Sequence, residues 1–98
     1  MLEQLGSTPD AVADSLRAAG IKGVRNTVRF LNPVVRYVRT QIPDVYGIDL
    51  ILGDRLRIVF ATGERTEEAV PEPVQRFLEG FHRGQYPDLE MPTGPGPG

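Results

Sequence analysis

The chain has 98 residues, a formal net charge of -2 and no cysteine. A chain of this length forms one domain, and the lack of cysteine excludes a disulfide scaffold, a thiolate zinc site and a cysteine nucleophile. The first residues lack the basic start and apolar run of a signal peptide, and no stretch is long enough to span a membrane. We therefore expect a cytoplasmic protein that does not enter a membrane.

The first predicted helix covers residues 9–19. Thr8 can cap its free N–H groups, and the following proline suits the first helical turn. Val12 and Leu16 are four residues apart and begin an apolar stripe along one face. Gly20 is a typical helix stop and ends this element.

The segment after Gly20 predicts two helices, one before and one after the pair Asn32-Pro33. Helical spacing of apolar residues indicates a short helix near 26–31. Asn32 then provides a second cap, and a helix is predicted over 33–42. Its apolar stripe consists of Val35, Val38 and Ile42, with arginines on the opposite face.

Residues 45–61 predict a β-hairpin, because two apolar runs flank Gly53-Asp54. A two-residue loop would place Leu50 opposite Arg57 on one face. A three-residue loop over 53–55 would instead pair Leu50 with Ile58, and burial should select this register. It places Leu50, Ile58 and Phe60 on one side of the hairpin and Asp49, Arg57 and Val59 on the other.

The C-terminal third predicts an edge strand, a helix and a tail. Residues 67–70 are expected to add a short third strand. The last helix starts at 71–73 and stops at Gly84, and the segment after it should place Tyr86 and Leu89 against the core. Residues 91–98 are rich in glycine and proline, so we expect a disordered tail after a single domain over 1–90.

These elements predict an α+β fold, with three or four helices packed on one face of a two- or three-stranded antiparallel sheet. The expected order is helix, helix, helix, hairpin, helix. A small sheet with one apolar face needs such a cover to be stable. The predicted core contains Val12, Leu16, Val35, Val38, Leu50, Ile58, Phe60, Val74, Phe77, Leu78 and Phe81.

Three stretches, 16–23, 32–37 and 77–89, resemble a group of short, uncharacterised bacterial proteins. The resemblance covers most of residues 8–90. It implies a single small domain and brings no known activity with it. Some members of that group place cysteines just before the proline of the second stretch. Residues 30–32 contain none, so the resemblance implies no thiol chemistry in this chain.

The polar residues do not form a recognisable catalytic set. His82 is the only histidine, and we interpret it as a surface or capping residue near a helix C-terminus, where a positive ring is favoured. Neither Ser7 nor Ser15 lies in a glycine-flanked nucleophile elbow. We therefore expect no catalytic residue, no metal site and no cofactor, and the protein is predicted not to be an enzyme.

Charge is segregated along the sequence. Residues 15–43 contain six basic residues and no acidic one, so the remainder carries a net charge of -8. This segregation favours a partner of complementary charge or pairing within the fold. The simpler interpretation is that these bases form solvated faces, some paired with Asp44, Glu64, Glu67 or Glu68.

The preferred functional hypothesis is a non-catalytic accessory protein that binds another protein. Its partner-binding residues would be Arg25, Arg29, Arg36 and Arg39, and a homodimer through a hairpin edge is a further expectation. The alternative is a winged-helix-like nucleic-acid-binding module that uses the basic stretch 17–39. The acidic net charge and Pro33, inside the would-be recognition helix, count against that alternative.

Overall fold

The structure is a computed structural model that describes residues 2–26, 31–51 and 54–91. Its elements are the 3₁₀ helix η1 (Leu2–Leu5), α1 (Pro9–Ala18), α2 (Pro33–Gln41), β1 (Val45–Ile51), β2 (Arg55–Phe60), β3 (Arg65–Ala69), α3 (Glu72–His82) and the 3₁₀ helix η2 (Pro87–Leu89). The predicted α+β class is confirmed. Within the described ranges, no helix is both long and apolar enough to cross a bilayer.

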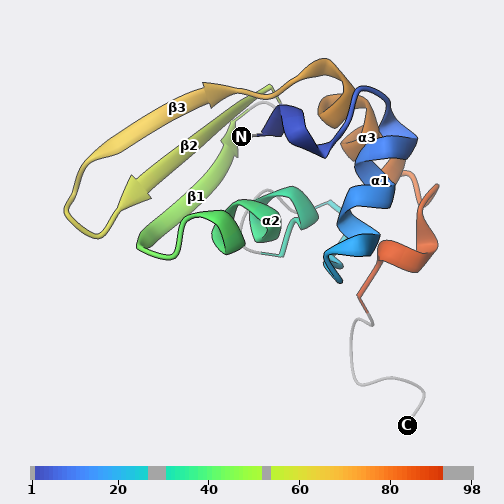
Figure 1. Cartoon of the computed structure of the whole chain (residues 1–98), viewed down its shortest axis with the longest axis horizontal. Helices are drawn as coiled ribbons and strands as arrows, with labels where there is room; N and C mark the ends of the chain where they lie inside the picture. The colour runs from blue at the N-terminus through green and yellow to red at the C-terminus, as the bar shows by residue number, and fades with distance from the viewer. Residues whose placement is uncertain (1, 27–30, 52–53, 92–98) are drawn as a thin grey trace, which may run out of the picture.

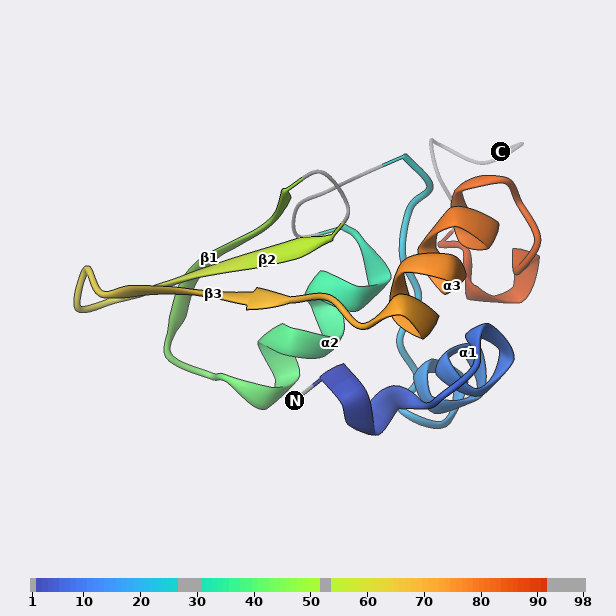
Figure 2. The same ribbon diagram turned by 90° about the horizontal axis from the view of Figure 1, so that it is seen from above.

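The three strands form one antiparallel sheet in the order β1-β2-β3, which confirms the predicted third strand at the edge. Helix α2 runs along the sheet and packs against β1, whereas α1 and α3 pack on each other to the side of the sheet (Figures 1 and 2). The predicted cover of three or four helices on one face is therefore wrong for the described elements, because α1 and α3 bury their apolar stripes against each other. Because β2 lies in the middle of the sheet, β1 and β3 are its two edge strands. The homodimer through a hairpin edge stays a prediction.

The predicted element order is wrong between α1 and the sheet. The short helix expected near 26–31 falls largely on residues 27–30, which lie outside the described residues. At its flanks the backbone is not helical, because Asn26 has φ 60 and the Val24 N–H donates to the Leu31 carbonyl at 2.8 Å. The described chain therefore runs helix, helix, three strands, helix.

The predicted helix ends are confirmed by their hydrogen bonds. The Thr8 hydroxyl accepts from the Ala11 N–H at 3.1 Å and caps α1. The Asn32 side-chain oxygen accepts from the Val34 N–H at 2.9 Å and caps α2. Gly20, with φ 71, follows α1 in the left-handed conformation that favours glycine.

The hairpin has the predicted faces but different partners. Leu50 pairs with Leu56 rather than Ile58, and the last pair of the ladder is Ile51 with Arg55. The three positions between the strands are therefore 52–54, not 53–55. A shift of two residues preserves the alternation, so Leu50 and Ile58 still face the core. Asp49 pairs with Arg57 on the opposite face, as predicted.

The predicted core residues are buried except Phe60, which is partly buried and packs against the core. Sequence periodicity missed the leucines of η1 and also Ile21. This isoleucine follows Gly20, and its N–H donates to the Leu16 carbonyl at 3.0 Å. Such a bond closes a helix end and folds the next apolar residue onto the helix. The other buried residues absent from the predicted core are Ala13, Val34, Ile48, Leu56 and Val70.

The C-terminal segment returns to the loop after α1. The Gly23 N–H donates to the Leu89 carbonyl at 2.9 Å, and the Met91 N–H donates to the Gly23 carbonyl at 2.8 Å. Leu89 is buried and Tyr86 packs against the core, as predicted. The predicted tail lies outside the described residues from position 92 onward. Met91 itself is held against Gly23, which brings it close to the basic stretch.

Candidate functional site

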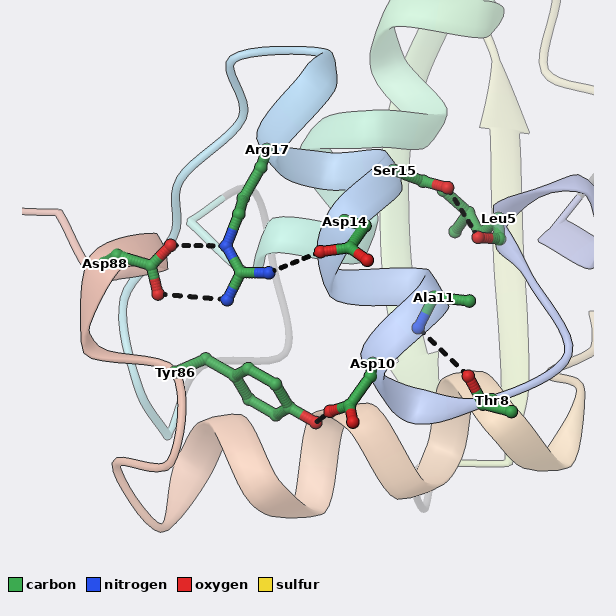
Figure 3. Close-up of polar contacts among 9 residues, drawn as sticks. All are labelled: Leu5, Thr8, Asp10, Ala11, Asp14, Ser15, Arg17, Tyr86 and Asp88. Atoms are coloured by element: carbon green, nitrogen blue, oxygen red, sulfur yellow. Dashed lines mark hydrogen bonds and ion pairs between the residues drawn. The ribbon is translucent and has the colours of Figure 1, made fainter.

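The first arginine of the basic stretch, Arg17, is engaged within the fold. Its guanidinium forms an ion pair with Asp88 of η2 and another with Asp14 of α1, the latter at 2.7 Å (Figure 3). The Tyr86 hydroxyl donates to Asp10 at 3.1 Å on the same side of α1. These contacts attach η2 and the segment before it to α1.

The charges in this cluster stabilise one another. Arg17 holds the pKa of Asp88 below its usual range through their hydrogen bond, and Asp88 in turn raises the pKa of Arg17. Burial raises the pKa of Tyr86, and the hydrogen bond to Asp10 acts in the same direction. Because Arg17 is already held by two carboxylates, we assign it a structural role.

Arg25 also makes an internal contact, although with backbone rather than with a carboxylate. Its Nε donates to the carbonyl of His82, the last residue of α3, at 3.0 Å. One residue later, the Asn26 N–H donates to Nδ1 of the His82 ring at 2.8 Å. The end of α3 therefore holds the start of the loop between α1 and α2.

His82 is not the positively charged cap that its position suggests. Its pKa is lowered from 6.5, first by burial and then by the charge of Arg25. Among the described residues, Arg25 is the charged group that contributes to this lower pKa. The ring also lies edge-on to Phe81, with centroids 5.7 Å apart. Burial and the charge of Arg25 thus outweigh the expected attraction of a helix C-terminus for a positive ring.

We expect acidification from about pH 7 to about pH 5 to destabilise the fold through His82. Because its folded-state pKa lies below 6.5, the unfolded chain takes up the proton first. The stabilising contribution is therefore present above 6.5 and is lost as the pH falls through the folded pKa. Urea unfolding at the two pH values should show a smaller loss for His82→Asn, whose amide oxygen can accept from Asn26 but does not titrate. An equal loss in both proteins would contradict this assignment.

Arg36 and Arg39 line an open hollow of about 350 Å³ together with Ile21 and Thr40. Both arginines lie on α2, three residues apart, and therefore share one side of that helix. Neither forms an ion pair with a carboxylate in the part of the chain that the structure describes. This hollow is the candidate binding site.

Arg36 has poor acceptors in its present position. Its Nη1 donates to the Met91 sulfur at 3.6 Å, and a thioether is a weak acceptor. Its Nε is buried and has no hydrogen-bond partner among the residues that the structure describes. An unsatisfied buried donor of this kind is rare in native proteins and calls for a physical explanation.

The structure thus separates the four predicted partner-binding arginines. Arg36 and Arg39 are brought together, Arg25 bonds to the end of α3, and Arg29 lies outside the described residues. Ile21 and Met91 were missed, because they come from segments with no local binding motif. Thr40 follows Arg39 directly, and its place four residues after Arg36 on one helix could have indicated it.

Among the described residues, no ion pair joins the basic stretch to Asp44, Glu64, Glu67 or Glu68, so that expected pairing is not found. Glu67 of β3 instead pairs with Arg55 at 3.3 Å and with Arg57 at 3.8 Å, both on the neighbouring strand. Cross-strand neighbours lie close enough to take these contacts first. Glu67 is thus paired with two arginines of β2 rather than with the arginines of α2.

No group of three or more histidine, cysteine, aspartate or glutamate side chains among residues 2–26, 31–51 and 54–91 could hold a metal ion. Comparisons with protein-family models, with curated proteins and with solved structures found no match to this chain.

Proposed function

We propose that this protein is a non-catalytic interaction protein that binds an acidic surface of another protein through Arg36 and Arg39. The observation that carries the proposal is the hollow on α2, where two arginines share one opening and lack a carboxylate partner among the described residues. Arg17, Arg55, Arg57 and Arg76, by contrast, each have one.

A non-catalytic role is supported by how the most reactive side chains are used. Nδ1 of His82 accepts from the Asn26 backbone. The Ser15 hydroxyl donates to the Leu5 carbonyl at 2.6 Å, which fastens η1 to α1 (Figure 3). A general base and a nucleophile would need to lie within hydrogen-bond reach of each other. These two side chains serve different backbone segments instead.

A local acidic surface suits this site better than a long polyanion does. The whole chain carries a net charge of -2, which gives little long-range attraction for nucleic acid. Close to α2, however, two guanidinium groups that have no carboxylate partner among the described residues can form charge-assisted, bidentate hydrogen bonds to carboxylates. We therefore favour a protein partner over nucleic acid.

Removing both guanidinium groups should weaken partner binding at least about tenfold, since each charge-assisted hydrogen bond contributes about 1.5–3 kcal/mol. The test titrates a partner isolated by co-purification from the native host against wild type and against Arg36→Gln/Arg39→Gln. The matched control is Arg65→Gln/Arg83→Gln, which changes the net charge equally at two exposed arginines outside α2. The control should bind like wild type.

Two outcomes would contradict the proposal. Equal loss of affinity in both double variants would mean that net charge, and not this site, determines binding. Micromolar, salt-sensitive binding of generic DNA or RNA that disappears only in Arg36→Gln/Arg39→Gln would replace the protein partner by nucleic acid.

A further inference from the structure

Arg36 has more donors than its surroundings satisfy. Nε is buried and meets no acceptor in the described part of the chain, and the acceptor of Nη1 is the thioether of Met91 at 3.6 Å. A guanidinium carries five N–H donors in a planar fork that matches a carboxylate. An incoming carboxylate can therefore replace a weak acceptor by a strong one, with little competition from the existing contact.

The other walls of the hollow restrict the kind of ligand. The Thr40 hydroxyl donates to the Tyr37 carbonyl at 2.6 Å, so its proton is already used. Ile21 supplies an apolar wall and is 6% exposed. The hollow is thus lined by two guanidinium side chains and by the small part of Ile21 that remains exposed.

The volume of the hollow also restricts the kind of ligand that it can hold. The hollow is about 350 Å³, near the low end of the roughly 300–1,000 Å³ that ligand pockets span. A space of this size suits one or two side chains of a partner rather than a long charged chain. A purely acidic ligand would leave the isoleucine wall without an apolar contact, whereas a mixed ligand would cover it.

We infer that this hollow binds one acidic side chain of a protein partner together with an adjacent apolar side chain. The carboxylate is held by Arg36 and Arg39, and the apolar group packs on Ile21. On binding, Nη1 of Arg36 exchanges the Met91 sulfur for a carboxylate oxygen. This inference rests on the proposed function and specifies the chemistry of the partner at the same site.

Three end-blocked peptides test the inference: Gly-Ser-Leu-Glu-Leu-Ser-Gly, its Glu→Gln analogue, and an analogue in which both leucines are serine. Titrations into ¹⁵N-labelled protein would follow the backbone signals of α2 and the Arg36 Nε–Hε signal. We expect the first peptide to bind at least tenfold more tightly than the Glu→Gln analogue, to bind measurably more tightly than the serine analogue, and to shift the Arg36 signal.

A conservative variant separates the fork geometry from the charge. Arg36→Lys keeps the positive charge and the aliphatic stem but cannot form a bidentate contact. We expect at least fivefold weaker binding of the first peptide, with the melting temperature measured alongside to show that the variant is folded. Arg65→Lys, on β3, is the matched control and should bind like wild type.

The outcomes distinguish this inference from the proposed function. Equal binding of the Leu-Glu-Leu and Ser-Glu-Ser peptides, or an unaffected Arg36→Lys, would overturn the inference, while the partner titration could still support a basic docking site. Inorganic phosphate binding as tightly as the first peptide would also overturn it. If the isolated partner is insensitive to Arg36→Gln/Arg39→Gln as well, the proposed function fails with it.

Discussion

Phe77→Ala is expected to lower the free energy of unfolding by about 3–5 kcal/mol, the usual cost of truncating a fully buried phenylalanine. Phe77 is 0% exposed, and its ring lies 5.9 Å from that of Phe81 and 4.9 Å from that of Tyr86. The substitution therefore removes an aromatic cluster as well as apolar area. A domain of this size has about 5–10 kcal/mol in total, so a large share would be lost.

Thermal unfolding should show this loss as a decrease in melting temperature of roughly 15–30 °C. Tyr46→Ala is a suitable control, since that aromatic side chain is 76% exposed on β1 and contributes little burial. We expect the control to melt close to wild type. If Phe77→Ala and Tyr46→Ala melt together, the assignment of the core around α3 is wrong.

Gly23→Ala is expected to be the second most damaging change, at about 1–3 kcal/mol, which is typical of overpacking. A Cβ at this position would lie 2.5 Å from the Pro33 backbone nitrogen and 2.8 Å from the Leu31 carbonyl oxygen. Both are backbone atoms that cannot move aside like a flexible side chain. Gly23 also forms backbone hydrogen bonds with Leu89 and Met91 of the C-terminal segment. Displacing Gly23 would therefore weaken these two bonds as well.

The control for this prediction is Gly47→Ala in β1. A Cβ there would meet no atom within 4 Å, and replacing a strand glycine reduces the conformational freedom of the unfolded chain. Urea unfolding should therefore show wild-type stability or slightly more for Gly47→Ala, and a clear loss for Gly23→Ala. Equal stability of the two variants would contradict the close approach of Gly23 to the start of α2.

The position of Gly23 also matters for the candidate site. This residue follows Lys22 and Ile21, pairs with Met91 and approaches the proline that begins α2. Ile21 and Met91 are thereby placed around Arg36, although they come from two distant segments. A disturbance at Gly23 should therefore weaken partner binding together with stability.

Elements whose signals lie within a few residues could be predicted from the amino-acid sequence. Thr8 and Asn32 cap their helices by bonding to N–H groups two or three positions away. The hairpin faces were also correct, because alternation of apolar residues decides burial even when the partners shift by two. The short helix predicted near 26–31 rested on apolar spacing alone, whereas Asn26 at its start has a left-handed φ.

Which arginines are held within the fold could not be predicted from the sequence and depends on tertiary packing. Arg17, Arg25 and Arg36 look alike in the sequence, since all belong to the same basic stretch. In the fold, Arg17 is paired with Asp88, Arg25 bonds to the His82 carbonyl, and Arg36 meets only the Met91 sulfur among described acceptors. These partners are 71, 57 and 55 positions away. Contacts over such separations depend on how the C-terminal segment packs, and no local spacing encodes that.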